Sequence, residues 1–169
     1  MIEVYKYYSK CNQEINAQLL KIIEEHEPNI FDYQVEGYYK SIGEILNHYY
    51  VADLIWLHSF KTVKEFSVYK HPIMEKIPEY GEQLFLNITE LKENRMKLDE
   101  IIVELTNEIE TEDLYKTVTR ITGSGEKLEK IFWKTLLHVF NHQTHHRGQI
   151  SQILDKLKIE NDYSNMIRH

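Results

Sequence analysis

Apolar residues recur at the spacing of an amphipathic helix in four long stretches of this 169-residue chain, and this periodicity restricts the fold more than any other feature. In the first stretch, Ile15, Leu19, Ile22 and Ile23 follow the three- and four-residue steps that place side chains on one helix face. The predicted helices cover residues 4–26, 41–63, 82–110 and 131–157. Helices with one apolar face bury it against one another, which predicts an all-α four-helix bundle.

The connections between these helices carry their own signals. Ser41 followed by Glu44 has the spacing of a capping box, so the second helix is expected to begin at Ser41. Residues 64–81 contain two prolines and Tyr80-Gly81, which break regular helix. We therefore expect a long crossover between the second and third helices.

The segment before the last helix has a different pattern. Residues 115–121 are rich in β-branched side chains and alternate in polarity, and Gly123-Ser124-Gly125 follows as a turn. This pattern predicts a short β-hairpin. The polar tail from Lys158 is expected to lie along the surface.

Length and charge limit the classes of function. The chain is the size of one domain, expected to span residues 1–169. With 27 acidic and 20 basic residues its formal charge is −7, which argues against a nucleic-acid-binding surface. No apolar run is long enough to cross a membrane, and residues 1–10 lack a signal pattern, so the cytoplasm is expected.

Nine histidines are present, and His138, His142, His145 and His146 all fall in the last predicted helix. At about 100° of rotation per residue, His142 and His146 fall inside the apolar stripe, and the other two fall on its flank. A buried imidazole without a partner costs about 1–3 kcal/mol. Rings four residues apart can converge on one ion at about 2.0–2.1 Å, so we favour a metal site over a hydrogen-bonded structural pair.

A third ligand has to come from another helix, because a catalytic site commonly has three protein ligands. On the second predicted helix His48 borders the apolar stripe, and His58 can also face the interior nearer the other end. Both are candidates, with His48 better placed. We expect His26, His71 and His169 to be solvated.

Two other metal architectures fail on spacing. A ferritin-like di-iron bundle needs a glutamate three residues before a histidine, and no histidine of this sequence has an acidic residue there. A zincin needs His-Glu-x-x-His, but Gln143, Thr144 and His145 stand between His142 and His146. The last helix therefore brings no general base of its own.

The motif His-x3-His-x3-His-Arg-Gly-Gln-Ile over residues 138–150 resembles the signature of the DinB/YfiT-like superfamily. Residues 41–48, followed by Asp53 and Trp56, are similar to the same family's pattern, as is the hairpin with Gly125. The resemblance covers essentially the whole chain. It implies a four-helix bundle with a long crossover, and it does not imply DNA binding.

The resemblance also implies a site. Carried over by position, the metal ligands are His48, His142 and His146, which selects His48 over His58. The cofactor would be one divalent ion, such as Zn, Ni or Fe. Family members are often homodimers, and their activities include transfer of low-molecular-weight thiols and some hydrolase assignments.

From these observations we expect a metal-dependent enzyme. Three neutral imidazoles leave a divalent ion its full charge and an open position, where it lowers the pKa of a bound water or thiol. Thiol transfer to an electrophile is favoured, with a small-molecule thiol or electrophile as partner, and hydrolysis is second. The alternative is a non-catalytic, metal-stabilised stress-response bundle that binds a ligand or partner.

Residues around the motif have structural expectations. Arg147 is predicted to point away from the ligands, as a salt-bridge or dimer-surface residue. Gly148 costs about 1 kcal/mol relative to alanine within a helix, which suggests close approach of another helix. Asn141 or Gln149 is expected to orient a ligand.

Overall fold

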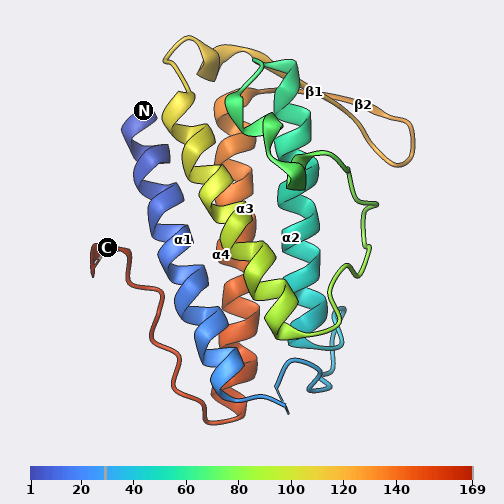
Figure 1. Cartoon of the computed structure of the whole chain (residues 1–169), viewed down its shortest axis with the longest axis vertical. Coiled ribbons are helices and arrows are strands. Elements are labelled where there is room, and N and C mark those ends of the chain that lie inside the picture. Colours follow the sequence, from blue (N-terminus) through green and yellow to red (C-terminus); the bar gives the residue numbers. More distant parts are fainter. Residues whose placement is uncertain (29, 169) are drawn as a thin grey trace.

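The computed structural model describes residues 1–28 and 30–168, and it is a bundle of four long helices. They run roughly along one axis, with a two-stranded hairpin at one end (Figure 1). The helices are α1 (Ile2–Glu25), α2 (Ile42–Ser59), α3 (Ile88–Glu108) and α4 (Phe132–Lys156). The predicted all-α bundle with a hairpin before the last helix is confirmed.

Helix α2 begins where the sequence predicts. The Ser41 hydroxyl accepts from the Glu44 backbone N–H at 3.2 Å, while the Glu44 carboxylate accepts from the Lys40 N–H at 2.8 Å. These bonds satisfy backbone groups that the first helical turn leaves free. At Gly43 the ring of Phe31 comes so close that an added Cβ would lie 2.6 Å from a ring carbon. Glycine therefore lets the 26–41 connection pack onto α2.

The crossover between α2 and α3 contains three short 3-10 helices, Phe60–Thr62, Ser67–Lys70 and Pro72–Met74. Helix α3 begins later than the predicted residue 82, because Asn87 caps it by accepting from the Glu90 N–H at 2.9 Å. The preceding residues are held elsewhere: the buried Asn47 side chain accepts from the backbone N–H groups of Leu84 and Phe85, each at 2.9 Å.

The hairpin pairs β1 (Thr117–Ile121) with β2 (Lys127–Ile131) in antiparallel register. Val118 of β1 is buried in the core, and the Thr119 N–H donates to the Thr62 hydroxyl at 3.0 Å. These contacts hold the hairpin over one end of the bundle (Figure 1).

The chain after α4 turns back along the bundle. Tyr163 is buried, and its hydroxyl donates to the Arg147 carbonyl at 3.0 Å. The predicted surface tail is thus anchored to α4. Gly148 does not have the expected close neighbour: within the described residues no atom lies within 4 Å of an added Cβ.

The core has two apolar clusters with buried polar residues between them. One cluster lies towards the hairpin and the other towards the 26–41 connection. In α3, Arg95 and Asp99 lie between the cluster residues Leu91 and Ile101. None of the helices in the described ranges combines the length and hydropathy of a membrane span.

Candidate metal centre

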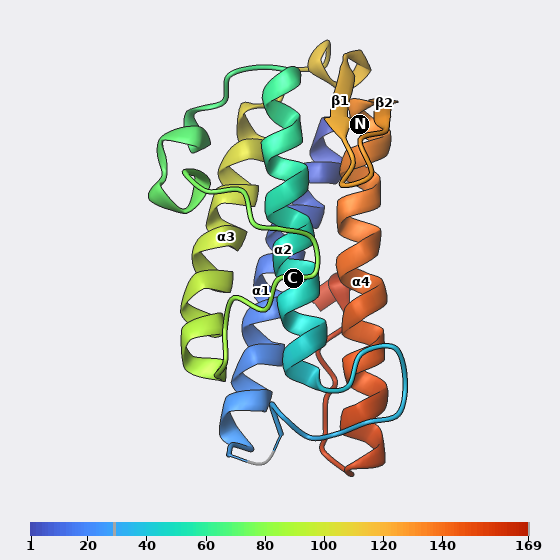
Figure 2. The same cartoon turned by 90° about the vertical axis from the view of Figure 1, so that its right-hand side faces the viewer.

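Helices α2 and α4 pack side by side (Figure 2). Three of their histidines, His48 of α2 and His142 and His146 of α4, come together between them. The Nε2 atom of His142 lies 3.2 Å from that of His48 and 3.0 Å from that of His146. All three ligand atoms lie within 4.8 Å of one another. The chain thus gathers the three residues that the sequence motif singled out.

The other histidines do not join this cluster. His58 on α2 and the α4 neighbours His138 and His145 lie outside it. His26 is exposed as expected, and the partly exposed His71 bonds to Glu104 at 2.9 Å. His169 lies outside the described residues.

The spacing of the nitrogens fits one ion. Two nitrogen ligands that each lie about 2.0–2.1 Å from a tetrahedral zinc are about 3.3–3.4 Å apart. The observed Nε2–Nε2 distances of 3.0 and 3.2 Å would therefore have to increase only slightly for these nitrogens to hold an ion. Within the described residues the cluster contains no carboxylate and no thiol. Three imidazole donors suit several first-row metals, zinc and nickel among them. These three close histidines could bind a metal ion.

The chain orients one of these rings directly. The Nδ1 atom of His146 lies 2.8 Å from the Gln149 side-chain oxygen, which can only accept. Nδ1 therefore carries the proton, and the lone pair of Nε2 faces the centre. Gln149 orients a candidate ligand as expected, whereas the other candidate, Asn141, is exposed.

The three rings are held neutral. Burial lowers the pKa of His142 to about 3 and that of His146 to about 4, and the proximity of the other rings adds to both shifts. Burial also lowers the pKa of His48. At neutral pH each ring is therefore neutral and keeps one unprotonated nitrogen, which can bind a cation.

Aromatic side chains from the loops surround the cluster. The ring of Tyr39 lies 5.0 Å from that of His48 and 5.6 Å from that of His146, and the ring of Tyr80 lies 5.7 Å from that of His48. Tyr39 comes from the 26–41 connection and Tyr80 from the crossover. On the side of His142 the wall opens into a cavity of about 230 Å³.

A buried hydrogen bond ties the two ligand-bearing helices together. Gln143, next to His142, donates to the Asp53 carboxylate of α2 at 2.8 Å. The same carboxylate oxygen accepts from Arg95 of α3 at 2.6 Å. Burial raises the pKa of Asp53 to about 6, while Arg95 opposes that rise.

The prediction for Arg147 is wrong. This side chain is buried, and its guanidinium donates to Asn12 at 2.6 Å and to Asn16 at 3.1 Å, both on α1. Asn16 in turn donates to the Asp99 carboxylate. A wheel of α4 alone points Arg147 away from the ligands, but α1 covers that side and supplies polar partners.

Asp53 was part of the family pattern in the sequence but had no predicted role, and Tyr39 and Tyr80 were not predicted at the site. Asp53 interrupts the otherwise apolar run from Val51 to Leu57, which is a signal of a buried charge with a partner. Tyr39 and Tyr80 come from loops, and no periodicity could place them at the site.

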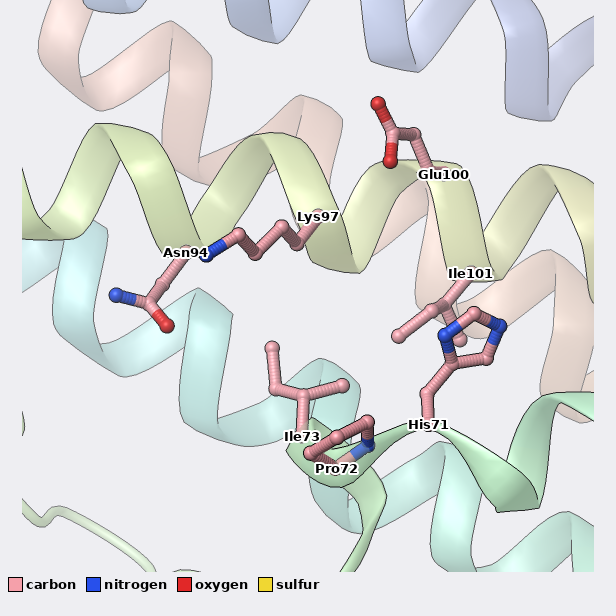
Figure 3. Close-up of a pocket in the computed structure, with 7 residues that line it drawn as sticks. All are labelled: His71, Pro72, Ile73, Asn94, Lys97, Glu100 and Ile101. Carbon is pink, nitrogen blue, oxygen red and sulfur yellow. The ribbon is translucent and has the colours of Figure 1, made fainter.

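A larger cavity of about 500 Å³ lies elsewhere, between α3 and the crossover (Figure 3). Two of its polar side chains already have partners: Lys97 pairs with Glu93, and His71 bonds to Glu104. It shares no lining residue with the cavity beside His142.

Comparison with known proteins agrees with the motif. The family model described as "DinB family" matches residues 1–158. The chain is similar to Protein DinB of Bacillus subtilis (strain 168), with 27% identity over 154 residues, covering 90% of this chain and 83% of that protein. No solved structure matches the chain significantly.

Proposed function

Since the chain belongs to the DinB family, and three of its imidazoles converge on one point, we propose that it is a metal-dependent enzyme. Its ligands would be the Nε2 atoms of His48, His142 and His146, holding one divalent ion. The reaction would be transfer of a small thiol to an electrophile. The observation that carries this proposal is the close approach of these nitrogens: the Nε2 atom of His142 lies 3.0 Å from that of His146 and 3.2 Å from that of His48, and all three lie within 4.8 Å of one another.

Each surrounding residue has a defined task in this proposal. Gln149 fixes the tautomer of His146, so that its Nε2 offers a lone pair. The Gln143–Asp53 hydrogen bond holds α4 against α2, which keeps His142 near His48. The ring of Tyr39 covers two of the three imidazoles and limits the access of water.

The cavity beside His142 supports an enzyme over the non-catalytic alternative. A purely structural metal site is usually closed by four protein ligands, whereas a catalytic site keeps an open position. Here the cluster has three ligands within the described residues, and a space of about 230 Å³ adjoins it. When bound, a divalent ion acts as a Lewis acid and lowers the pKa of a water or thiol that binds to it. The same property would serve hydrolysis, the second candidate reaction.

Metal analysis tests the ligand assignment. Protein purified without chelator, then loaded with zinc or nickel and desalted, should retain one ion per chain. His142→Ala should lose that ion, because it removes the nitrogen nearest both other ligands. His145→Ala is the matched control, since this exposed neighbour lies outside the cluster. Retention of a stoichiometric ion by His142→Ala would refute the assignment.

Activity separates the remaining alternatives. The loaded protein, mixed with mercaptoethanol and a chromogenic aryl halide, should consume the thiol faster than the His142→Ala variant does. Ester hydrolysis without thiol consumption would favour the hydrolase. Neither activity, in protein that holds its ion, would favour the non-catalytic bundle. The homodimer and the cytoplasmic location stay predictions.

A further inference from the structure

The cavity beside His142 is built from four separate parts of the chain. Trp56 comes from α2, Tyr80 from the crossover, Arg120 from β1, and His138 and His142 from α4. The ring of His138 lies 5.8 Å from that of His142 and 5.3 Å from that of Trp56. The cavity therefore meets the histidine cluster at His142, and its other walls include aromatic and cationic side chains.

Strand geometry explains why Arg120 reaches this cavity. Side chains two residues apart on a strand share a face. Val118 is buried against the bundle, so Arg120 points to the same side. Its guanidinium lies 5.1 Å from the centre of the Trp56 ring. The aromatic contact holds the cation over α2, near the cluster.

The charge of this cavity is not balanced by the chain. The protein carries a net charge of −7, yet no aspartate or glutamate lines the cavity. Within the described residues Arg120 forms no ion pair, whereas the buried Arg95 has two carboxylate partners. Burial lowers the pKa of Arg120, in keeping with a cation that lacks a counter-charge.

We propose that Arg120 binds the carboxylate of the substrate, whose reacting end faces His142. This inference rests on the proposed function, and it narrows the substrate class to small molecules that carry a carboxylate. A guanidinium presents a planar fork of donors that matches a carboxylate. The pairing would also supply the counter-charge that the cavity lacks.

Charge favours a carboxylate over a phosphate, and the volume of the cavity favours a small substrate. A phosphate monoester carries about −1.5 to −2 charges at neutral pH, more than one guanidinium balances. The cavity, at about 230 Å³, is below the ~300–1,000 Å³ typical of sites for drug-sized ligands. It suits a compact group within a small substrate.

The experiment compares an acid with its amide. The probes are β-mercaptopropionate and β-mercaptopropionamide, which share a thiol and a length but differ in charge. Each is titrated into zinc-loaded protein in a Trp133→Phe background, where Trp56 is the remaining tryptophan and lines the cavity. Binding is followed by tryptophan fluorescence, which is independent of turnover. The acid should bind about tenfold or more tightly than the amide, as expected for a hydrogen bond to a charged group.

Three variants test whether Arg120 is the residue that distinguishes the acid from the amide. Arg120→Met should bind the two probes equally, and Arg120→Lys should keep part of the preference for the acid. Lys127→Met removes the same charge from the other strand of the hairpin, and it should keep the full preference. Circular dichroism of each variant checks that the fold is intact.

The outcomes separate this inference from the proposed function. If zinc does not bind to the protein, the proposed function fails, and the metal-free comparison of propionate with propionamide still tests Arg120. If zinc binds but acid and amide bind equally, the inference is wrong. If Lys127→Met loses as much of the preference for the acid as Arg120→Met does, the preference comes from the positive charge of the hairpin as a whole and not from Arg120. If inorganic phosphate competes more strongly than propionate, the assignment of a carboxylate to this cavity is wrong.

Discussion

Replacing Arg95 with methionine removes a cation that two buried carboxylates share. The guanidinium, fully buried, donates to Asp53 and Asp99 at 2.6 Å each. Methionine fills much of the same space without a charge. Asp99 keeps the Asn16 amide and Asp53 keeps Gln143, but within the described residues neither keeps a direct ion pair, and the charge of Arg147 acts on Asp99 only from beyond Asn16.

The expected loss of stability is large. Breaking a buried ion pair by removing one partner costs about 3–5 kcal/mol, against a total of about 5–15 kcal/mol for a typical domain. For a chain of this size, that loss lowers Tm by about 6–20 °C. Urea unfolding should show a lower midpoint with the same m value, since the surface exposed on unfolding is unchanged.

The loss should depend on pH. Burial already raises the pKa of Asp53 to about 6, and it raises that of Asp99 as well. Without Arg95 both values rise further, above the ~3.9 of an unfolded aspartate. Because a raised carboxyl pKa costs stability as the pH increases, Arg95→Met should lose less near pH 5 than near pH 7.5.

A control lies two residues further along the same helix. Lys97→Met breaks only the exposed pair with Glu93, and the unfolding midpoint should stay unchanged. Combining Arg95→Met with Asp53→Asn and Asp99→Asn removes the uncompensated charges and should recover much of the loss. An Arg95→Met protein within about 1 kcal/mol of the parent at neutral pH would refute this reasoning.

Three further predictions concern the cluster and two glycines. When a chelator has removed the metal, the free energy of unfolding should fall as the pH decreases from about 6.5 to 4, because the imidazoles of the unfolded chain take up protons at a higher pH than those of the folded chain. In urea titrations, His142→Asn should make this pH dependence weaker. Gln149→Ala should weaken zinc binding about 10–100-fold by calorimetry, and unchanged affinity would contradict its orienting role. In thermal unfolding Gly43→Ala should destabilise by about 1–3 kcal/mol through the clash with Phe31, whereas the exposed Gly148→Ala should stabilise by about 0.5–1 kcal/mol; the opposite signs would contradict the packing described.

The helical framework was predictable because it depends on local signals. Periodicity located all four helices, and the Ser41–Glu44 spacing placed the start of α2. The start of α3 was wrong by several residues, because Asn47 of another helix holds the chain there in a non-helical form. The sequence around residues 82–87 gives no sign of that contact, because Asn47 is distant along the chain.

The site was predictable in part. His142 and His146 share one face of α4, and a helical wheel of the sequence identifies that face as the apolar one. Helix α2 is different, since it is buried on nearly every side and has no polar face to orient the wheel. Periodicity alone therefore left His48 and His58 open, and the family motif selected between them. Arg120 and Tyr80 reach the site only through tertiary packing.

The hydrogen bond between Gln143 and Asp53 has a consequence for assembly of the bundle. A slip of α4 along α2 by one residue is about 1.5 Å, and one helical turn is about 5.4 Å. Either displacement would move His142 away from His48, whose Nε2 atoms now lie 3.2 Å apart, and it would also pull Gln143 from its carboxylate. A chelating triad thus exists only in a correctly aligned bundle, so metal uptake during refolding would report the moment at which the two helices reach their final alignment.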